Sequence, residues 1–118
     1  MMDMYKLVDN IPVPCTVEEW GEMHRSNRSV GKTELPDGNI VSTVFLGLDH
    51  NHSRTGDPIL FESMLFPAGS AIEEDMERYC TWDEAVEGHW KMVEKHGGTK
   101  PLTKEQCRTE LDEGLFEL

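Results

Sequence analysis

The side chains best suited to chemistry lie in the polar segment 49–57 and at Glu62 and His89 beyond it. His50 and His52 form a His-x-His pair, which on an extended backbone directs both rings to the same side. Imidazole and carboxylate groups together bind divalent metals, so His50, His52 and His89 are the candidate metal ligands. A solvated turn in which Asp49 accepts backbone amides is the alternative and favoured interpretation of the same segment.

Glu62 is unusual because it interrupts the apolar run from Pro58 to Phe66. A carboxylate in such a strand is either paired with a cation or placed at the edge of a cavity. At a cavity edge, burial raises the pKa of a carboxyl group and suits it to act as an acid or a base. The alternative is an ion pair with Arg28, Arg54 or Arg78.

His89 falls on the apolar stripe of a predicted helix and is expected to face the sheet. It either meets Glu62 or the loop that carries His50, or is a buried structural histidine that needs one hydrogen bond. Convergence of these three side chains predicts a metal-dependent hydrolase or a nucleotide-binding site. The sequence contains no glycine-rich phosphate loop and no G-x-S-x-G motif, and it identifies no cofactor.

Capped helices and a sheet are predicted to position these residues. Capping boxes at Thr16 and Thr81 begin a short helix and the main helix, and a third capped start at Thr103 begins a short terminal helix. The tail 112–118 is expected to be frayed or docked through its apolar residues. Proline residues make the segment 5–13 an extended or edge strand.

Further strands are predicted at 28–35, 40–48, 58–66 and 78–80. The strand at 40–48 has bulky apolar groups on both faces, which predicts a central strand covered over most of its length. Together these elements predict one α+β domain spanning residues 1–118. We expect an antiparallel β-sheet of three to five strands, with one main helix and one or two short helices packed on one face.

The composition limits the function classes. Twenty-three acidic and eleven basic residues give a formal net charge of −12, which repels phosphate backbones, so direct nucleic-acid binding is not expected. No apolar run is long enough to span a membrane, and the first residues do not resemble a secretory signal. Three widely spaced cysteines, Cys15, Cys80 and Cys107, predict reduced thiols and a cytoplasmic protein.

Three blocks of the sequence carry a resemblance. They are VSTVFLGLDH at 41–50, PILFESMLF at 58–66 and RYCTWDEAVEGH at 78–89. Together they resemble a family of small uncharacterised bacteriophage and prophage proteins, whose members share VSTVFLGLDH and RYxTWxEAxxGH motifs. The resemblance, with the region around Cys15 and Trp20, extends to about Val93. Ser63, where the family often has threonine, and the loop containing His52 depart from the family pattern.

The resemblance implies a phage protein in the host bacterial cytoplasm. It directs attention to the motif positions Asp49, His50, Glu62, Thr81, Trp82 and His89 as a candidate ligand or polar site. The leading expectation is a non-enzymatic accessory protein that binds a host protein or a small ligand and counteracts host defence or regulation. The alternatives are the metal-dependent or nucleotide-binding site and a virion or assembly component, and each is compatible with a homo-oligomer.

Overall fold

The computed structural model describes residues 3–26, 28–53 and 55–100. This part of the chain forms a two-stranded and a four-stranded antiparallel sheet with two helices, which confirms the predicted α+β class. The elements in order are β1 (Tyr5–Val8), β2 (Ile11–Pro14), α1 (Val17–Arg25), β3 (Ser29–Glu34), β4 (Ile40–Phe45), β5 (Phe61–Phe66), β6 (Asp75–Tyr79) and α2 (Trp82–Lys95). The predicted helix at 103–111 and the tail 112–118 lie outside the described residues.

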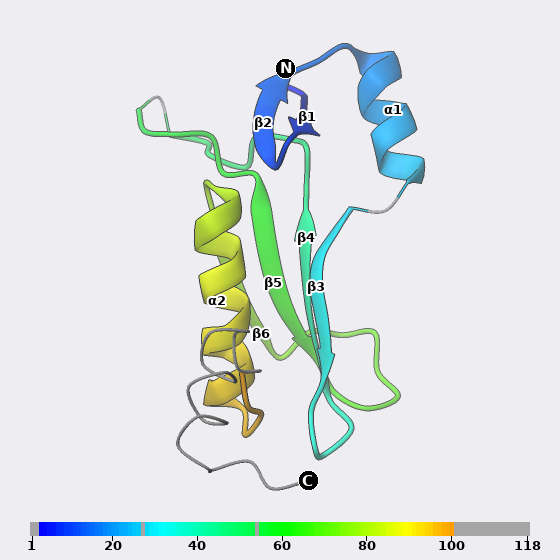
Figure 1. Ribbon diagram of the computed structural model, residues 1–118, viewed down its shortest axis with the longest axis vertical. Helices are drawn as coiled ribbons and strands as arrows, with labels where there is room; N and C mark the ends of the chain where they lie inside the picture. Colours follow the sequence, from blue (N-terminus) through cyan, green and yellow to red (C-terminus); the bar gives the residue numbers. More distant parts are fainter. Residues whose placement is uncertain (1–2, 27, 54, 101–118) are drawn as a thin grey trace, which may run out of the picture.

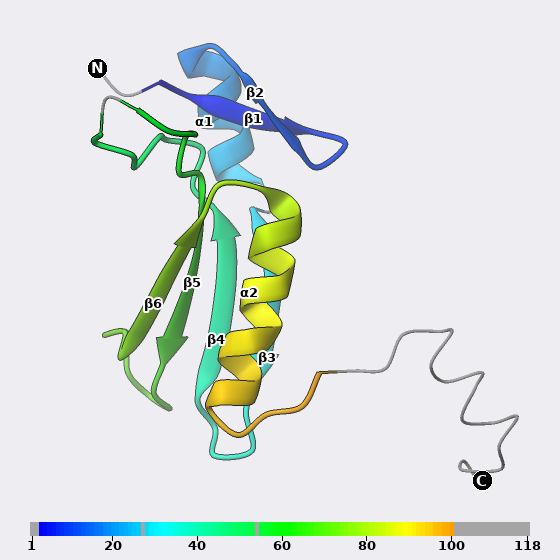
Figure 2. The ribbon, with the colours of Figure 1, turned by 90° about the vertical axis from the view of Figure 1, so that its left-hand side faces the viewer.

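The larger sheet is a meander in which the strand order β3-β4-β5-β6 follows the sequence (Figure 1). Its register pairs Thr43 with Ser63 across β4 and β5, and Glu62 with Arg78 across β5 and β6. Helix α2 follows β6 directly and lies against one face of this sheet (Figure 2). Paired residues point to the same face, so the register decides which side chains meet α2.

Both predicted capping boxes are present. In α1 the Thr16 side chain accepts from the Glu19 amide, and in α2 the Thr81 side chain accepts from the Glu84 amide. In each case the glutamate carboxylate accepts a hydrogen bond from the backbone amide of the capping residue. The two bonds satisfy amide groups that have no partner within the helix at its N-terminus. Neither helix of the described residues is long and apolar enough to cross a membrane.

The core under α2 has a polar layer between two apolar clusters. One cluster contains Leu35, Val41, Leu65, Met92 and Val93, and the other contains Phe45, Leu60, Phe61 and Ala85. Thr43, Ser63 and His89 are buried and occupy the intermediate positions of β4, β5 and α2. The sequence therefore places polar groups at the same level on three neighbouring elements.

The opposite face of the sheet is open. Within the described residues, α2 is the helix that packs on the four-stranded sheet, so the other face has no helix over it. Ile40, Val44 and Met64 are half-buried there, while the alternate residues of β4 are fully buried. The prediction of a central strand covered over most of its length holds in part, because β4 lies between β3 and β5 but, among the described residues, α2 covers one of its faces and the other is half-buried.

The N-terminal segment is a hairpin. Asp9 and Asn10 both have positive φ, 51° and 65°, and they join β1 to β2 in a two-residue turn. The single extended segment predicted for 5–13 is therefore wrong, because these two residues reverse the chain. The hairpin and α1 lie beyond one end of the larger sheet, where the Tyr5 amide donates to the Gly47 carbonyl at 2.8 Å (Figure 1).

Candidate functional site

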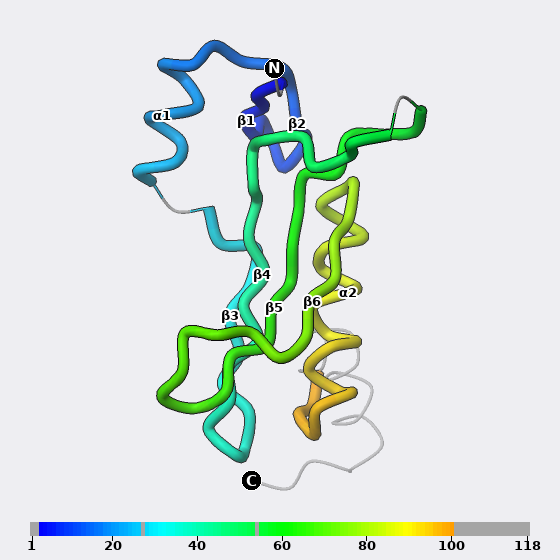
Figure 3. Tube along the Cα trace, turned by 180° about the vertical axis from the view of Figure 1, so that it is seen from behind, coloured from blue at the N-terminus to red at the C-terminus, as the bar shows by residue number. Residues whose placement is uncertain are grey.

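The loop between β4 and β5 projects from the same end of the sheet as the hairpin (Figures 1 and 3). The Asp49 carboxylate holds its base by accepting from the amides of Asn51 at 2.8 Å and Ile59 at 3.0 Å. His50 contacts the Leu48 carbonyl through Nδ1 at 2.7 Å, and His52 is exposed. These contacts match the interpretation of the segment as a turn held by its own side chains.

Glu62 is paired with a cation. Its Oε2 accepts from Arg78 Nε at 2.9 Å, and the Glu62 side chain is 8% exposed while that of Arg78 is 38% exposed. Both residues occupy the open face, because they are cross-strand partners adjacent to the buried Ser63. The ion pair with Arg78, one of the two interpretations of Glu62, is confirmed.

His89 is buried under α2 and bonded through both ring nitrogens. Its Nε2 lies 2.9 Å from the Thr33 hydroxyl and its Nδ1 lies 2.7 Å from the Thr43 hydroxyl. Thr43 in turn makes a short hydrogen bond with the Ser63 hydroxyl. Burial lowers the pKa of His89, so its neutral form is favoured in the folded protein. These contacts are those of a structural histidine.

The structure does not bring His50, Glu62 and His89 together. Glu62 is on the open face of the sheet, His89 is between the sheet and α2, and His50 is in the loop beyond the sheet. In the described part of the chain, no cluster of three or more His, Cys, Asp or Glu side chains is arranged to hold a metal ion. The predicted convergence is wrong, because Glu62 and Ser63 point to opposite faces and α2 covers the face of Ser63.

Trp82 occupies the first turn of α2 and packs edge-on against Phe61, with the ring centroids 6.2 Å apart. It also borders a shallow depression of about 450 Å³ between α2 and the β1–β2 turn, next to Asp9 and Asp83. Its main contact is with the core cluster that includes Phe45. Of the predicted site residues, Thr81 and Trp82 therefore line this depression.

Comparison with known proteins adds no assignment. No family model matches the chain, and no match was found among curated proteins or solved structures.

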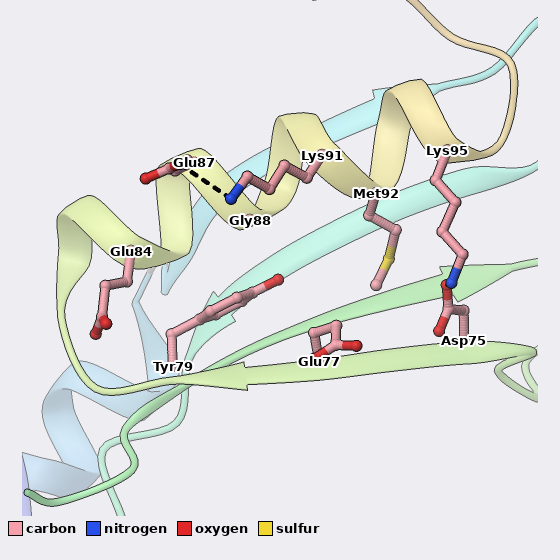
Figure 4. A pocket seen from close by; sticks show the side chains of 9 residues that line it. All are labelled: Asp75, Glu77, Tyr79, Glu84, Glu87, Gly88, Lys91, Met92 and Lys95. Atoms are coloured by element: carbon pink, nitrogen blue, oxygen red, sulfur yellow. Dashed lines mark hydrogen bonds and ion pairs between the residues drawn. The ribbon is translucent and has the colours of Figure 1, made fainter.

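A groove that was not predicted from the sequence runs between α2 and β6 (Figure 4). It has a volume of about 410 Å³, and its walls are Asp75, Glu77 and Tyr79 on the strand and Glu84, Glu87, Gly88, Lys91, Met92 and Lys95 on the helix. The helix residues recur at intervals of three and one, which is the spacing of one helical face. That spacing was the available sequence signal, but on its own it indicates only a mixed polar surface.

The groove has an aromatic and apolar floor with charged rims. Gly88 lies against the Tyr79 ring, since a Cβ there would come within 2.2 Å of Tyr79 Cζ. Burial raises the pKa of the Tyr79 phenol, whose hydroxyl is buried and has no hydrogen-bond partner among the described residues. Met92 is 3% exposed and contributes its side chain to the same floor.

One end of the groove is closed by an ion cluster. Asp75 Oδ2 accepts from His96 Nε2 at 2.8 Å and from Lys95 Nζ at 3.0 Å, which joins the start of β6 to the end of α2. The His96 and Lys95 contacts, in that order of size, hold the pKa of Asp75 at about 2, below its ordinary value of 3.8. The ionised form of Asp75 therefore stabilises the folded state.

We expect Asp75→Asn to lower the free energy of unfolding near neutral pH by about 1 to 2 kcal/mol. Because the pKa of Asp75 is depressed on folding, its stabilisation is complete above pH 3.8 and is lost as the pH falls toward 2. Urea unfolding of the wild type and the variant from pH 7 to pH 2 measures the difference. Equal stability at pH 7, or a difference that persists at pH 2, would contradict this role. The control Glu73→Gln changes an exposed carboxylate in the preceding loop.

Proposed function

We propose that the protein is a non-enzymatic binding protein whose target is another protein. The observation that carries this proposal is the groove beside β6, a strand with one neighbouring strand in the sheet, β5. A groove along such an edge strand suits the recognition of an extended polypeptide. Its lining in the described residues contains no histidine or cysteine and no serine that could serve as a nucleophile with a base.

The hydrogen bonds and ion pairs already made by the predicted site residues support the same proposal. His89 bonds with two threonine hydroxyls, Glu62 is paired with Arg78, and Asp49 accepts two backbone amides. Each of these contacts contributes to the fold. A catalytic role for any of them would require breaking a contact that holds the sheet, the helix or the loop in place.

The resemblance to phage proteins extends the proposal to a host protein in the bacterial cytoplasm as the target. With a formal net charge of −12, the protein would approach a basic partner by electrostatic attraction. A host protein that handles nucleic acid has such a basic surface. Binding to that surface would displace the nucleic acid and so counteract host defence or regulation.

The test is affinity capture of the tagged protein from nuclease-treated host lysate, combined with infection assays of a phage with and without the gene. We expect one host protein to be retained in a near-stoichiometric complex and infection to be less efficient without the gene on a host that expresses that protein. Native mass spectrometry of the purified protein tests for a bound small ligand. No retained partner together with unchanged infection would refute the proposal.

A second candidate function, an assembly component of the virion, is favoured by the open sheet face. Val44, Met64 and Phe66 are half-buried there, and Met76 on β6 is 41% exposed. Apolar side chains gathered on one face suit contact with a further copy of the chain or another subunit. Light scattering after size exclusion would detect self-association, and mass spectrometry of purified particles would detect the protein in the virion.

A further inference from the structure

The outer edge of β6 has a short stretch of backbone available for pairing. In an antiparallel strand, the main-chain groups of alternate residues point to opposite sides. The Tyr79 carbonyl points toward β5, because it accepts from the Leu60 amide at 3.0 Å. The amides of Met76 and Cys80 instead donate to the carboxylates of Asp75 at 2.9 Å and Glu84 at 3.2 Å.

This alternation places the amide and the carbonyl of Arg78 on the outer side of the sheet, between two amides that already have carboxylate acceptors. A strand added here would therefore pair chiefly with Arg78. Its residues on either side of that pair would point to the face of Glu77 and Tyr79, which is the face covered by α2. Those side chains would enter the groove.

The charges on the groove walls define what those side chains should be. Asp75 is engaged by Lys95 and His96, and Glu87 is paired with Lys91 at 3.1 Å. Glu84 accepts bonds at the helix start. Glu77 is exposed, and no ion pair joins it within the part of the chain that the structure describes.

The floor beside Glu77 is apolar and aromatic. Tyr79 is two residues further along the same face of β6, and Met92 projects from α2 near Glu77 on the side toward Asp75 (Figure 4). A residue facing Glu77 is therefore complementary when it is lysine or arginine, and a residue facing Tyr79 is complementary when it is apolar.

We infer that the groove between α2 and β6 binds an extended basic segment of a partner protein, added as a strand at Arg78. A lysine or arginine of that segment pairs with Glu77, and an apolar residue two positions away packs on Tyr79. This inference rests on the proposed function and specifies its site and the chemistry of its partner. Main-chain hydrogen bonds supply affinity in this mode, and the alternate side chains supply specificity.

The probe is a fluorescent heptapeptide of sequence Thr-Leu-Thr-Lys-Thr-Leu-Thr, which presents leucine and lysine alternately on one face in either strand direction. We expect fluorescence anisotropy to give a dissociation constant of about 100 μM. Glu77→Lys should weaken binding at least about tenfold. The matched variant Glu73→Lys, which makes the same charge change in the exposed loop before β6, should leave binding unchanged.

Methylated peptides test the strand pairing separately from the charge. N-methylation of the two threonines that flank the lysine removes the amides that point toward β6, including the one that pairs with Arg78, so binding should be lost. N-methylation of the lysine affects an amide that points away from β6 and should have little effect. Thermal unfolding of each protein variant confirms that its fold is retained.

Two outcomes overturn the inference. One is no saturable binding of the heptapeptide up to about 1 mM, and the other is binding that is equally sensitive to Glu73→Lys and Glu77→Lys. If a captured host protein still binds Glu77→Lys as it binds the wild type, the site is refuted while the proposed function stands. If no protein is captured at all, the proposed function itself fails.

Discussion

Replacement of His89 by alanine is expected to lower the free energy of unfolding by about 3 kcal/mol. The side chain is 2% exposed and lies between the two apolar clusters, so its removal leaves a cavity. The hydroxyls of the fully buried Thr43 and the half-buried Thr33 also lose their imidazole partner. Urea unfolding followed by tryptophan fluorescence measures the loss.

The pH dependence of stability distinguishes a buried neutral imidazole from a merely space-filling one. Burial depresses the pKa of His89 below its ordinary value of 6.5, so its stabilising contribution is present above pH 6.5 and is lost as the pH falls through the folded pKa. His89→Gln should therefore reduce the slope of stability against pH below 6.5. His52→Gln, in an exposed position of the loop, should leave stability at neutral pH unchanged.

A double-mutant cycle with Thr43→Val tests whether the two side chains act together. If the 2.7 Å hydrogen bond between Thr43 and His89 Nδ1 stabilises the fold, the losses of unfolding free energy in the two single variants will not add up to the loss in the double variant. Additive losses combined with an unchanged pH slope would show that His89 contributes through packing alone. That result would also remove the reason for treating the polar layer as one unit.

Local signals in the sequence predicted the elements well. The Thr-x-x-Glu boxes at Thr16 and Thr81 begin helices as expected, since capping depends on residues only three apart. The two-residue turn at Asp9 and Asn10 was missed because neither residue is glycine, although asparagine and aspartate tolerate positive φ. The hairpin is thus a failure to recognise local turn chemistry.

Prediction of the candidate site depended on contacts between residues that are far apart in the sequence. Glu62 and Ser63 differ by one position, and that single step decides which of them lies under α2 with His89. Because both faces of β4 and β5 carry apolar residues, their alternation did not show which face the helix covers. The groove could not be predicted for a similar reason. It forms where the face of α2 that carries both charged and apolar residues meets the edge strand β6.

Gly88→Ala is expected to lower the free energy of unfolding by about 2 to 3 kcal/mol, although alanine is ordinarily the better helix former by about 1 kcal/mol. The new methyl group would lie 2.2 Å from Tyr79 Cζ and 2.3 Å from its hydroxyl oxygen. The Tyr79 ring must then move into the groove or α2 must shift away from β6. Gly21→Ala in α1 is the matched control, because among the described residues its methyl would meet Arg25 Nη1 alone, at 3.4 Å.

The control Gly21→Ala should be neutral or stabilising, since nothing opposes the gain in helix propensity there. Tyr79→Leu shortens the side chain that Gly88 accommodates, so in that background Gly88→Ala should lose most of its destabilising effect. A destabilisation of the same size in both backgrounds would show that the ring does not determine the residue at this position. If Tyr79→Leu does relieve the overlap, Gly88 is explained as the residue that allows an aromatic side chain to form the floor of the groove between α2 and β6.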